Sequence, residues 1–256
     1  MVEDAKEATG SMGDDTPVAV LSNHYRPISH YFRQNFSQVT NPPIDSLREN
    51  KVMSLKTRFG NLGNILDFEN LTKENIYVLD SPVLTNSQLK KFKTMFSKKI
   101  KVIDCTFDTK NTLRNRIEEI REEAEIAVRG GANHLILSDQ NISEERAIVP
   151  MILAVGAIHS YLVKLSLRGY ASLNAQTAEA MDTHSFAVLI GVGATTVNPY
   201  LAIDSIFQRY EKKLFGELDF ASCVERFKKS INAGLLKIMS KMGISVLSSY
   251  RGGCNF

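Results

Sequence analysis

The sequence lacks any long apolar segment and any strong excess of charge. No apolar run in its 256 residues approaches the roughly 20 residues that a membrane-spanning helix needs. The first residues, Met1 to Lys6, are acidic and polar, unlike a signal peptide. Lysine and arginine number 31 against 28 aspartates and glutamates, and a net charge of +3 is too small to indicate a nucleic acid or membrane partner. These absences predict a cytoplasmic protein.

Cysteine is also scarce. Cys105, Cys223 and Cys254 are an odd number of thiols at wide, irregular spacings, so they form neither a disulfide framework nor a CxxC metal pair. His159 and His184 belong to no metal-ligand motif such as HExxH, and we interpret both as structural. We therefore predict no metal ligand and no catalytic residue in this chain.

The first 65 residues have little hydrophobic periodicity and carry two motifs rich in turn-forming residues. These are SMGDDTP over 11–17 and NFSQVTNPPID over 35–45. The Asn-Pro-Pro step biases the backbone toward extended geometry, because proline fixes its own φ and restricts the residue before it. We predict a long extended N-terminal arm over 1–65 with a brief helix over 28–36. An ordinary polar loop is the alternative interpretation.

Residues 66–256 alternate between apolar strands and amphipathic helices, which predicts one α/β domain with a mostly parallel sheet. The helix over 112–129 is the clearest, because its apolar residues recur every three or four positions and Gly130-Gly131 follows it. Gly234 is a candidate break in the last long helix. The expected strands cover 76–79, 101–105, 134–138, 171–175, 186–190 and 245–248, and the other expected helices cover 86–98, 150–168, 199–213 and 221–241.

Two further features allow a chemical interpretation and a plainer one. Gly191 to Thr196 resembles a phosphate-binding turn, but the third glycine of GxGxxG is missing, which favours a tight strand-to-helix turn over a nucleotide site. Three carboxylates lie in the arm motifs, namely Asp14, Asp15 and Asp45. An acid/base pair is possible in principle, but caps for turns and helix starts are the favoured use.

Several long motifs resemble the central domain of the glutamate synthase large subunit. They are SMGDDTP, YFRQNFSQVTNPPIDSLRE, HSFAVLIGVGA over 184–194, NPY over 198–200 and GLLKIMSKMGIS over 234–245. The resemblance spans nearly the whole chain. It implies a fold related to an irregular (βα)-barrel, and it implies that this chain is one fragment of a larger oxidoreductase of nitrogen assimilation.

The resemblance also implies what the complete enzyme does. A glutamine amidotransferase domain releases ammonia from L-glutamine, and the ammonia passes through an internal tunnel to condense with 2-oxoglutarate. The imine is then reduced to L-glutamate at an FMN-binding domain that is supplied by a 3Fe-4S cluster. Electrons come from a small electron-donating subunit or from ferredoxin. No cofactor is expected in this chain itself.

By the same resemblance, Thr40 and Asn41 in QVTNPP correspond to the wall of the ammonia tunnel, and Met12 in SMGDDTP lies near FMN. The family's ammonia-releasing domain uses an N-terminal cysteine, whereas this sequence starts with Met1-Val2. We therefore expect the isolated chain to be inactive. Gln176 and Ala178 depart from the family pattern, which puts any charged role at those two positions in doubt. The tail over 251–255 also departs from it, which weakens any contact inferred for the tail.

A different class of function remains open at this point. The chain could be a free-standing, non-catalytic α/β module that binds a ligand or a partner. The coding sequence on either side of the chain distinguishes the two, because the enzyme interpretation requires a flavin barrel in the same gene.

Overall fold

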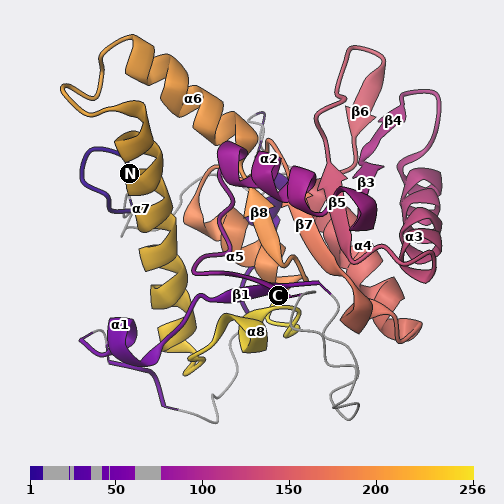
Figure 1. The fold of residues 1–256 in the computed structure, drawn as a ribbon, viewed down its shortest axis with the longest axis horizontal. Helices are drawn as coiled ribbons and strands as arrows, with labels where there is room; N and C mark the ends of the chain where they lie inside the picture. The colour runs from indigo at the N-terminus through magenta and orange to yellow at the C-terminus, as the bar shows by residue number, and fades with distance from the viewer. Residues whose placement is uncertain (8–22, 24–25, 36–41, 46, 61–75) are drawn as a thin grey trace.

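A four-stranded parallel sheet forms the centre of the computed structural model, which describes residues 1–7, 23, 26–35, 42–45, 47–60 and 76–256 (Figure 1). Its order is β3-β5-β7-β8, and the register aligns Ile100 with His134 and His134 with Ser172. The strands are β3 (Ile100–Asp104), β5 (His134–Ser138), β7 (Ser172–Gln176) and β8 (Thr196–Asn198). This confirms the predicted α/β class.

The sheet is open rather than barrel-like within the described residues. Beyond β8, the Val197 carbonyl accepts from the Leu84 N–H, and the Val197 N–H donates to the Pro82 carbonyl, both at 2.9 Å. Among the described residues, no strand closes the sheet back onto β3. The expected relation to a (βα)-barrel is therefore limited to the parallel strands and the helices between them.

Three helices cover one face of the sheet, namely α3 (Leu113–Arg129), α4 (Met151–Lys164) and α5 (Thr183–Gly191). The predicted stripe of α3 is buried at Ile120, Ala124 and Val128, and the Thr112 hydroxyl caps its N-terminus by accepting from the Asn115 N–H at 3.2 Å. Leu135 and Leu137 of β5 belong to the core on this face.

The opposite face carries α2 (Asn86–Met95) and the antiparallel pair β1 (Thr57–Phe59) and β2 (Tyr77–Leu79). Phe59 and Phe92 form a second, aromatic core there together with Ile136 of β5. Alternate residues of β5 thus face opposite layers, as the pleat requires. Thr85 and Gln88 form a reciprocal capping box at the start of α2.

The remaining elements lie around these layers. Figure 1 shows β4 (Thr106–Asp108) and β6 (Arg146–Ile148) projecting as an antiparallel pair beside α3, and α6 (Tyr200–Glu211) and α7 (Phe220–Lys241) on the other side. The short elements are η2 (Ile28–Tyr31), α1 (Glu49–Val52), η4 (Ser97–Lys99), η5 (Arg168–Tyr170) and α8 (Leu247–Tyr250). No helix in the described ranges is long and apolar enough to cross a membrane.

The strand predicted over 186–190 is wrong, because these residues belong to α5. Every residue from Phe186 to Ile190 is buried, so the sequence shows neither helical nor strand periodicity there. The missed signal is Asp182, which caps α5 by accepting from the Ser185 N–H at 2.8 Å. The fourth strand of the sheet is β8 instead.

Three smaller predictions are corrected. The helix expected over 28–36 is the single 3₁₀ turn η2, and the strand expected over 245–248 is reduced to one bridge between Ser54 and Val246, after which α8 begins. Gly234 does not interrupt α7. A Cβ at Gly234 would contact Thr183 of α5 closely, so this glycine allows two helices to approach rather than breaking one.

Candidate functional site

The two ends of the QVTNPP segment are attached to the C-terminal part of the molecule. Before the segment, the Asn35 N–H donates to the Asn255 carbonyl at 2.8 Å, and after it the Ile44 N–H donates to the Ser240 carbonyl at 2.8 Å. Ser240 belongs to the last turn of α7, where carbonyl groups have no partner within the helix. The predicted tunnel residues Thr40 and Asn41, and also Met12, lie outside the described residues.

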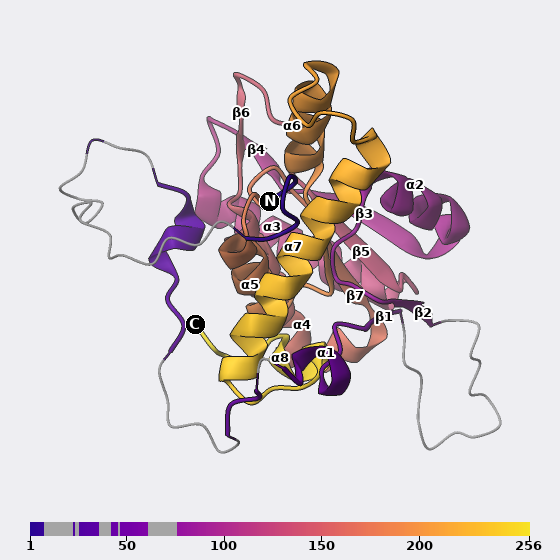
Figure 2. The ribbon, with the colours of Figure 1, turned by 90° about the vertical axis from the view of Figure 1, so that its left-hand side faces the viewer.

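Asp45 strengthens the second attachment. Its carboxylate accepts from the Leu47 N–H at 3.1 Å, and its carbonyl accepts from the Arg48 N–H at 2.8 Å. This turn leads into α1, whose Glu49 carboxylate accepts from the Ser240 hydroxyl at 2.7 Å. Figure 2 shows α1 against the C-terminal end of α7. Asp45 is therefore a turn cap, as predicted; Asp14 and Asp15 lie outside the described residues.

The first attachment continues through η2, which packs on α5. His184 of α5 has its Nε2 atom 2.9 Å from the Ser29 carbonyl, and Ser29 is buried. His184 thus joins η2 to α5 through a hydrogen bond. This agrees with the structural role expected from the sequence.

The carboxyl edge of the sheet is the usual ligand edge of α/β folds, and here its acidic groups have partners within the chain. Asp139, which follows β5, accepts from the Thr177 hydroxyl at 2.6 Å and from the Ala178 N–H. Glu179 accepts from the Met151 N–H at 2.6 Å, at the start of α4, and burial raises the pKa of its carboxyl group. Both carboxylates thus hold backbone in place.

Gln176 is the last residue of β7. Its Oε1 accepts from the Lys93 Nζ at 3.0 Å, and burial lowers the pKa of Lys93. Asn198 of β8 donates to the Leu84 carbonyl and to Asn86, both at 2.9 Å. A cleft of about 300 Å³ lies beside these groups, and the hydrogen bonds of Lys93 and of the Asn198 amide nitrogen join α2 and the segment before it to the sheet.

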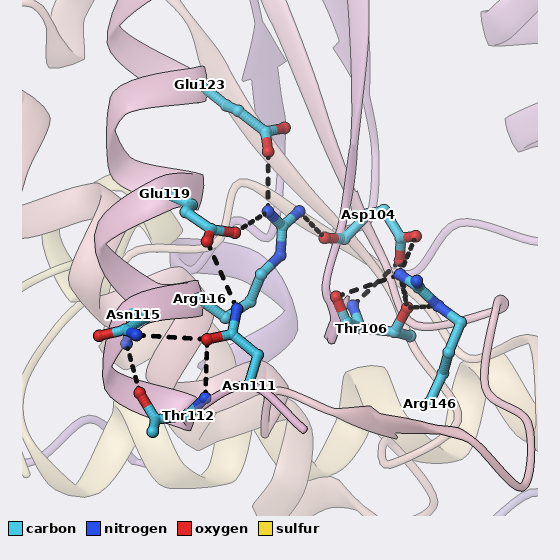
Figure 3. A network of polar contacts seen from close by, with 9 residues as sticks. All are labelled: Asp104, Thr106, Asn111, Thr112, Asn115, Arg116, Glu119, Glu123 and Arg146. Carbon is cyan, nitrogen blue, oxygen red and sulfur yellow. Dashed lines mark hydrogen bonds and ion pairs between the residues drawn. The ribbon is translucent and has the colours of Figure 1, made fainter. Parts of the chain in front are cut away.

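Figure 3 shows a second polar network at this edge, where Arg146 and Arg116 converge on Asp104. Arg146 pairs with the Asp104 carboxylate at 3.0 Å, and Arg116 donates to the Asp104 carbonyl at 2.7 Å. Arg116 also pairs with Glu119 and Glu123 of α3. Each cation here has an anionic partner, so this network fastens the β4–β6 pair and α3 to β3 and leaves no charge free for a ligand.

The glycine segment at Gly191 is a turn, but it joins helix α5 to strand β8 rather than a strand to a helix. Gly193 has φ +124°, and a Cβ there would overlap the His159 ring. The turn is filled by that imidazole, which leaves no room for a phosphate. The interpretation as a turn therefore holds, with the order of the elements reversed.

His159 connects this turn to a cluster of cationic side chains at the amino edge of the sheet. Its Nδ1 accepts from the Arg168 Nε at 3.1 Å, and burial together with Arg168 and Arg251 lowers the pKa of His159 to about 4. The ring is thus neutral near pH 7. Arg168 and Arg251 line the same cavity of about 420 Å³. Sequence analysis missed both, because a single arginine after a helix has no distinguishing pattern.

The cysteines of the described residues do not fit an iron–sulfur cluster. Cys105 and Cys223 are both fully buried, and burial raises the pKa of the Cys105 thiol to about 12, whereas a cluster needs thiolates. Cys254 is exposed at the tail, and the described residues hold no group of three or more potential metal ligands.

Comparison with known proteins gives one consistent family. The family model for the glutamate synthase central domain matches residues 1–256. The glutamate synthase (NADPH) large chain of Azospirillum brasilense is 57% identical over 100% of this chain and 17% of its own length. The corresponding protein of Bacillus subtilis and the chloroplastic ferredoxin-dependent glutamate synthase of Spinacia oleracea are 39% and 40% identical, each over 98% of this chain and 16% of its own length.

The flavin-binding domain of baker's yeast flavocytochrome b2 aligns with 68% of this chain and 38% of that chain at 16% identity, with a TM-score of 0.37, too low to carry an argument. The chain spans about 17% of the length of the curated relative from Azospirillum brasilense. A match over the full chain and identities of 39% to 57% show that it belongs to the glutamate synthase central domain family.

Proposed function

We propose that this chain works as the central domain of a glutamate synthase large chain, which makes L-glutamate from L-glutamine and 2-oxoglutarate. The family match over the whole chain carries this proposal. Because the chain covers 17% of its Azospirillum brasilense relative, the amidotransferase and FMN-binding domains would be supplied by the rest of the enzyme. FMN and a 3Fe-4S cluster would supply the electron transfer there, and the cytoplasm is the proposed location.

The electron donor would be either a nicotinamide-dependent small subunit or ferredoxin, since relatives of both kinds match. The proposed division of the chain is an arm over 1–65 and an α/β domain over 66–256. The boundary between residues 65 and 66 lies outside the described residues, while β1 on one side of it pairs with β2 on the other.

Within that enzyme, we propose that the arm forms part of the ammonia tunnel through Thr40 and Asn41. The attachments at Asn35 and Ile44 support this, because a narrow passage needs backbone at a fixed position. Pro42 and Pro43 restrict the backbone between Asn41 and the second attachment. Met12 is proposed to lie near FMN, where a polarizable thioether packs well against an aromatic ring.

The complete enzyme carrying Thr40→Trp tests the tunnel. A bulky side chain at the constriction should lower the glutamate formed per glutamine consumed, because glutamine is still hydrolysed and ammonia escapes into solution. Thr40→Val is the matched control, since it keeps the backbone carbonyl and nearly the same volume, and its ratio should equal that of the wild type. Pro42→Gly should lower the ratio by releasing the backbone.

If Thr40→Trp leaves both the ratio and the turnover rate unchanged, the arm is only a surface loop and the tunnel proposal is wrong. A separate test, reading the coding sequence on both sides of this chain, distinguishes the enzyme from the free-standing module. An adjoining flavin-binding domain supports the enzyme, and stop codons on both sides would support the module.

A further inference from the structure

The cavity at the amino edge of the sheet is lined by cationic side chains from three separate segments. Lys56 directly precedes β1 and Arg58 lies in it, Arg168 comes from η5, and Arg251 from the turn after α8. The cavity measures about 420 Å³, within the size range of small-molecule sites. Hydroxyl groups of Ser54, Thr57, Ser172, Thr195 and Ser248 also line it.

The described lining contains no aspartate or glutamate to balance this charge. Arg168 donates only to neutral acceptors, namely the Ala171 carbonyl at 2.5 Å, the Gly193 carbonyl at 2.9 Å, the Thr195 hydroxyl at 3.4 Å and His159. The Arg251 guanidinium forms no hydrogen bond or ion pair with any described residue. The Lys56 Nζ lies 3.9 Å from the Asp80 Oδ1, but both side chains are mostly exposed, so water weakens this ion pair.

The excess of positive charge around the cavity is electrostatically unfavourable. Burial and the neighbouring Arg251 lower the pKa of Arg168 to about 9, and burial lowers the pKa of Arg251. Buried cations in proteins are normally paired with an anion. The Figure 3 network follows that rule, since Arg116 and Arg146 both pair with carboxylates, and the amino-edge cavity breaks it.

The two arginines are held in place without an anion. Four hydrogen bonds hold the Arg168 guanidinium, and the Arg251 backbone N–H donates to the Leu247 carbonyl at 3.0 Å. Gly252 next to it has φ +67° and lies so close to His159 that a Cβ would be 2.7 Å from the ring Nε2. A rigid backbone beside Arg251 reduces the entropy lost when a ligand binds.

We propose that this cavity binds a small oxyanion, a carboxylate or phosphate group, with Arg251 as its main contact and Lys56 and Arg58 at the entrance. A planar guanidinium with two free N–H edges binds such groups in a bidentate manner. The site lies at the amino edge of the sheet, and neither Thr40 nor Asn41 is among its lining residues. Its existence does not depend on the tunnel, so either proposal can fail alone.

The test is isothermal titration calorimetry on the complete protein at constant ionic strength, with inorganic phosphate and succinate as separate probes. Saturable binding of at least one probe is expected. Arg251→Gln should raise its dissociation constant at least about tenfold, as loss of a hydrogen bond to a charged group predicts. Arg209→Gln is the matched control, because Arg209 is exposed on α6 outside the cavity lining, and it should leave the constant unchanged.

The tighter of the two probes identifies the source as phosphate or carboxylate. Arg251→Lys should lie between the wild type and Arg251→Gln, and circular dichroism verifies folding. If Arg251→Gln does not fold, Lys56→Gln and Arg58→Gln replace it, since both positions are exposed and should each weaken binding by a smaller factor. Absence of saturable binding in the wild type, or the same constant in every cavity variant, would overturn the proposal.

Discussion

At the scale of single residues, His159 is the most constrained side chain of the amino edge. It lies between Gly193 and Gly252, neither of which has room for a Cβ beside the ring, and its Nδ1 accepts from Arg168. Both glycines have positive φ, +124° and +67°. A neutral imidazole therefore sets the position of Arg168, and two glycine turns set the position of the imidazole.

Substituting Gly193→Ala should test this arrangement. The new methyl group must displace the His159 ring and adopt an unfavourable φ, so we expect a loss of about 2–4 kcal/mol in the free energy of unfolding, measured by urea titration. Gly131→Ala is the matched control, because Gly131 has φ +93° with nothing within 4 Å of the added Cβ. It should lose only about 1 kcal/mol, the cost of backbone strain alone. Equal losses in both variants would mean that His159 moves freely.

At the scale of elements, a row of buried polar side chains crosses the sheet beneath α2 and β1. His134 Nδ1 lies 2.9 Å from the Ser172 hydroxyl, which accepts from the Asn174 amide at 3.0 Å, and the Asn174 Oδ1 accepts from the Thr196 hydroxyl at 2.8 Å. Each of these polar side chains forms a hydrogen bond with the next, so the row can be buried without water. The His134 ring also packs edge-on against Phe92, with 4.8 Å between the ring centroids.

The row predicts a pH dependence of stability. Burial and nearby Lys99 lower the pKa of His134 from 6.5 to about 4. Below pH 6.5 the His134 imidazole is protonated in the unfolded chain but stays neutral in the folded one. Its contribution to the free energy of unfolding is therefore fully present above pH 6.5 and is lost as the pH decreases toward 4. The contribution is up to about 3 kcal/mol.

Urea unfolding of the purified chain between pH 4 and 7 measures the slope of the free energy of unfolding against pH. His134→Gln should flatten it by removing one of the two described imidazoles whose pKa burial lowers, with His159 accounting for much of the remainder. His30→Gln should leave the slope unchanged, because His30 is exposed on η2. A slope in His134→Gln equal to that of the wild type would show that this imidazole becomes protonated without loss of the fold.

At the scale of the whole molecule, α7 and the tail serve as the attachment for the arm. Ser240 accepts from Ile44 and donates to Glu49, while Asn255 accepts from Asn35. The arm is therefore fixed by the last part of the chain, and α5 and α7 connect that part to the sheet. Such an arrangement suits a domain that presents a segment to its neighbours.

The purified chain alone should show no flavin absorbance, no glutaminase activity and no glutamate synthesis. The reason is that the chain spans about 17% of its Azospirillum brasilense relative, and the amidotransferase and FMN-binding domains are proposed to lie in the rest of the enzyme. Absorbance spectra and assays with glutamine measure this, with the complete enzyme as the positive control. A yellow preparation with stoichiometric FMN would contradict the prediction.

The sequence by itself determined the α/β class, most of the helices and the family. The helix over 113–129 could be read directly, because its apolar stripe and its cap are local features. The motifs of the arm identified the family for the same reason, since long runs of residues carry that information without any folding.

Only the tertiary structure decided the rest. Residues 186–190 are buried on every side, so their helical form depends on packing against α4 and α7 rather than on a pattern in the chain. The cationic cavity likewise joins Lys56, Arg168 and Arg251. These residues are distant in the sequence, and only the fold brings their charges close enough to act on one another.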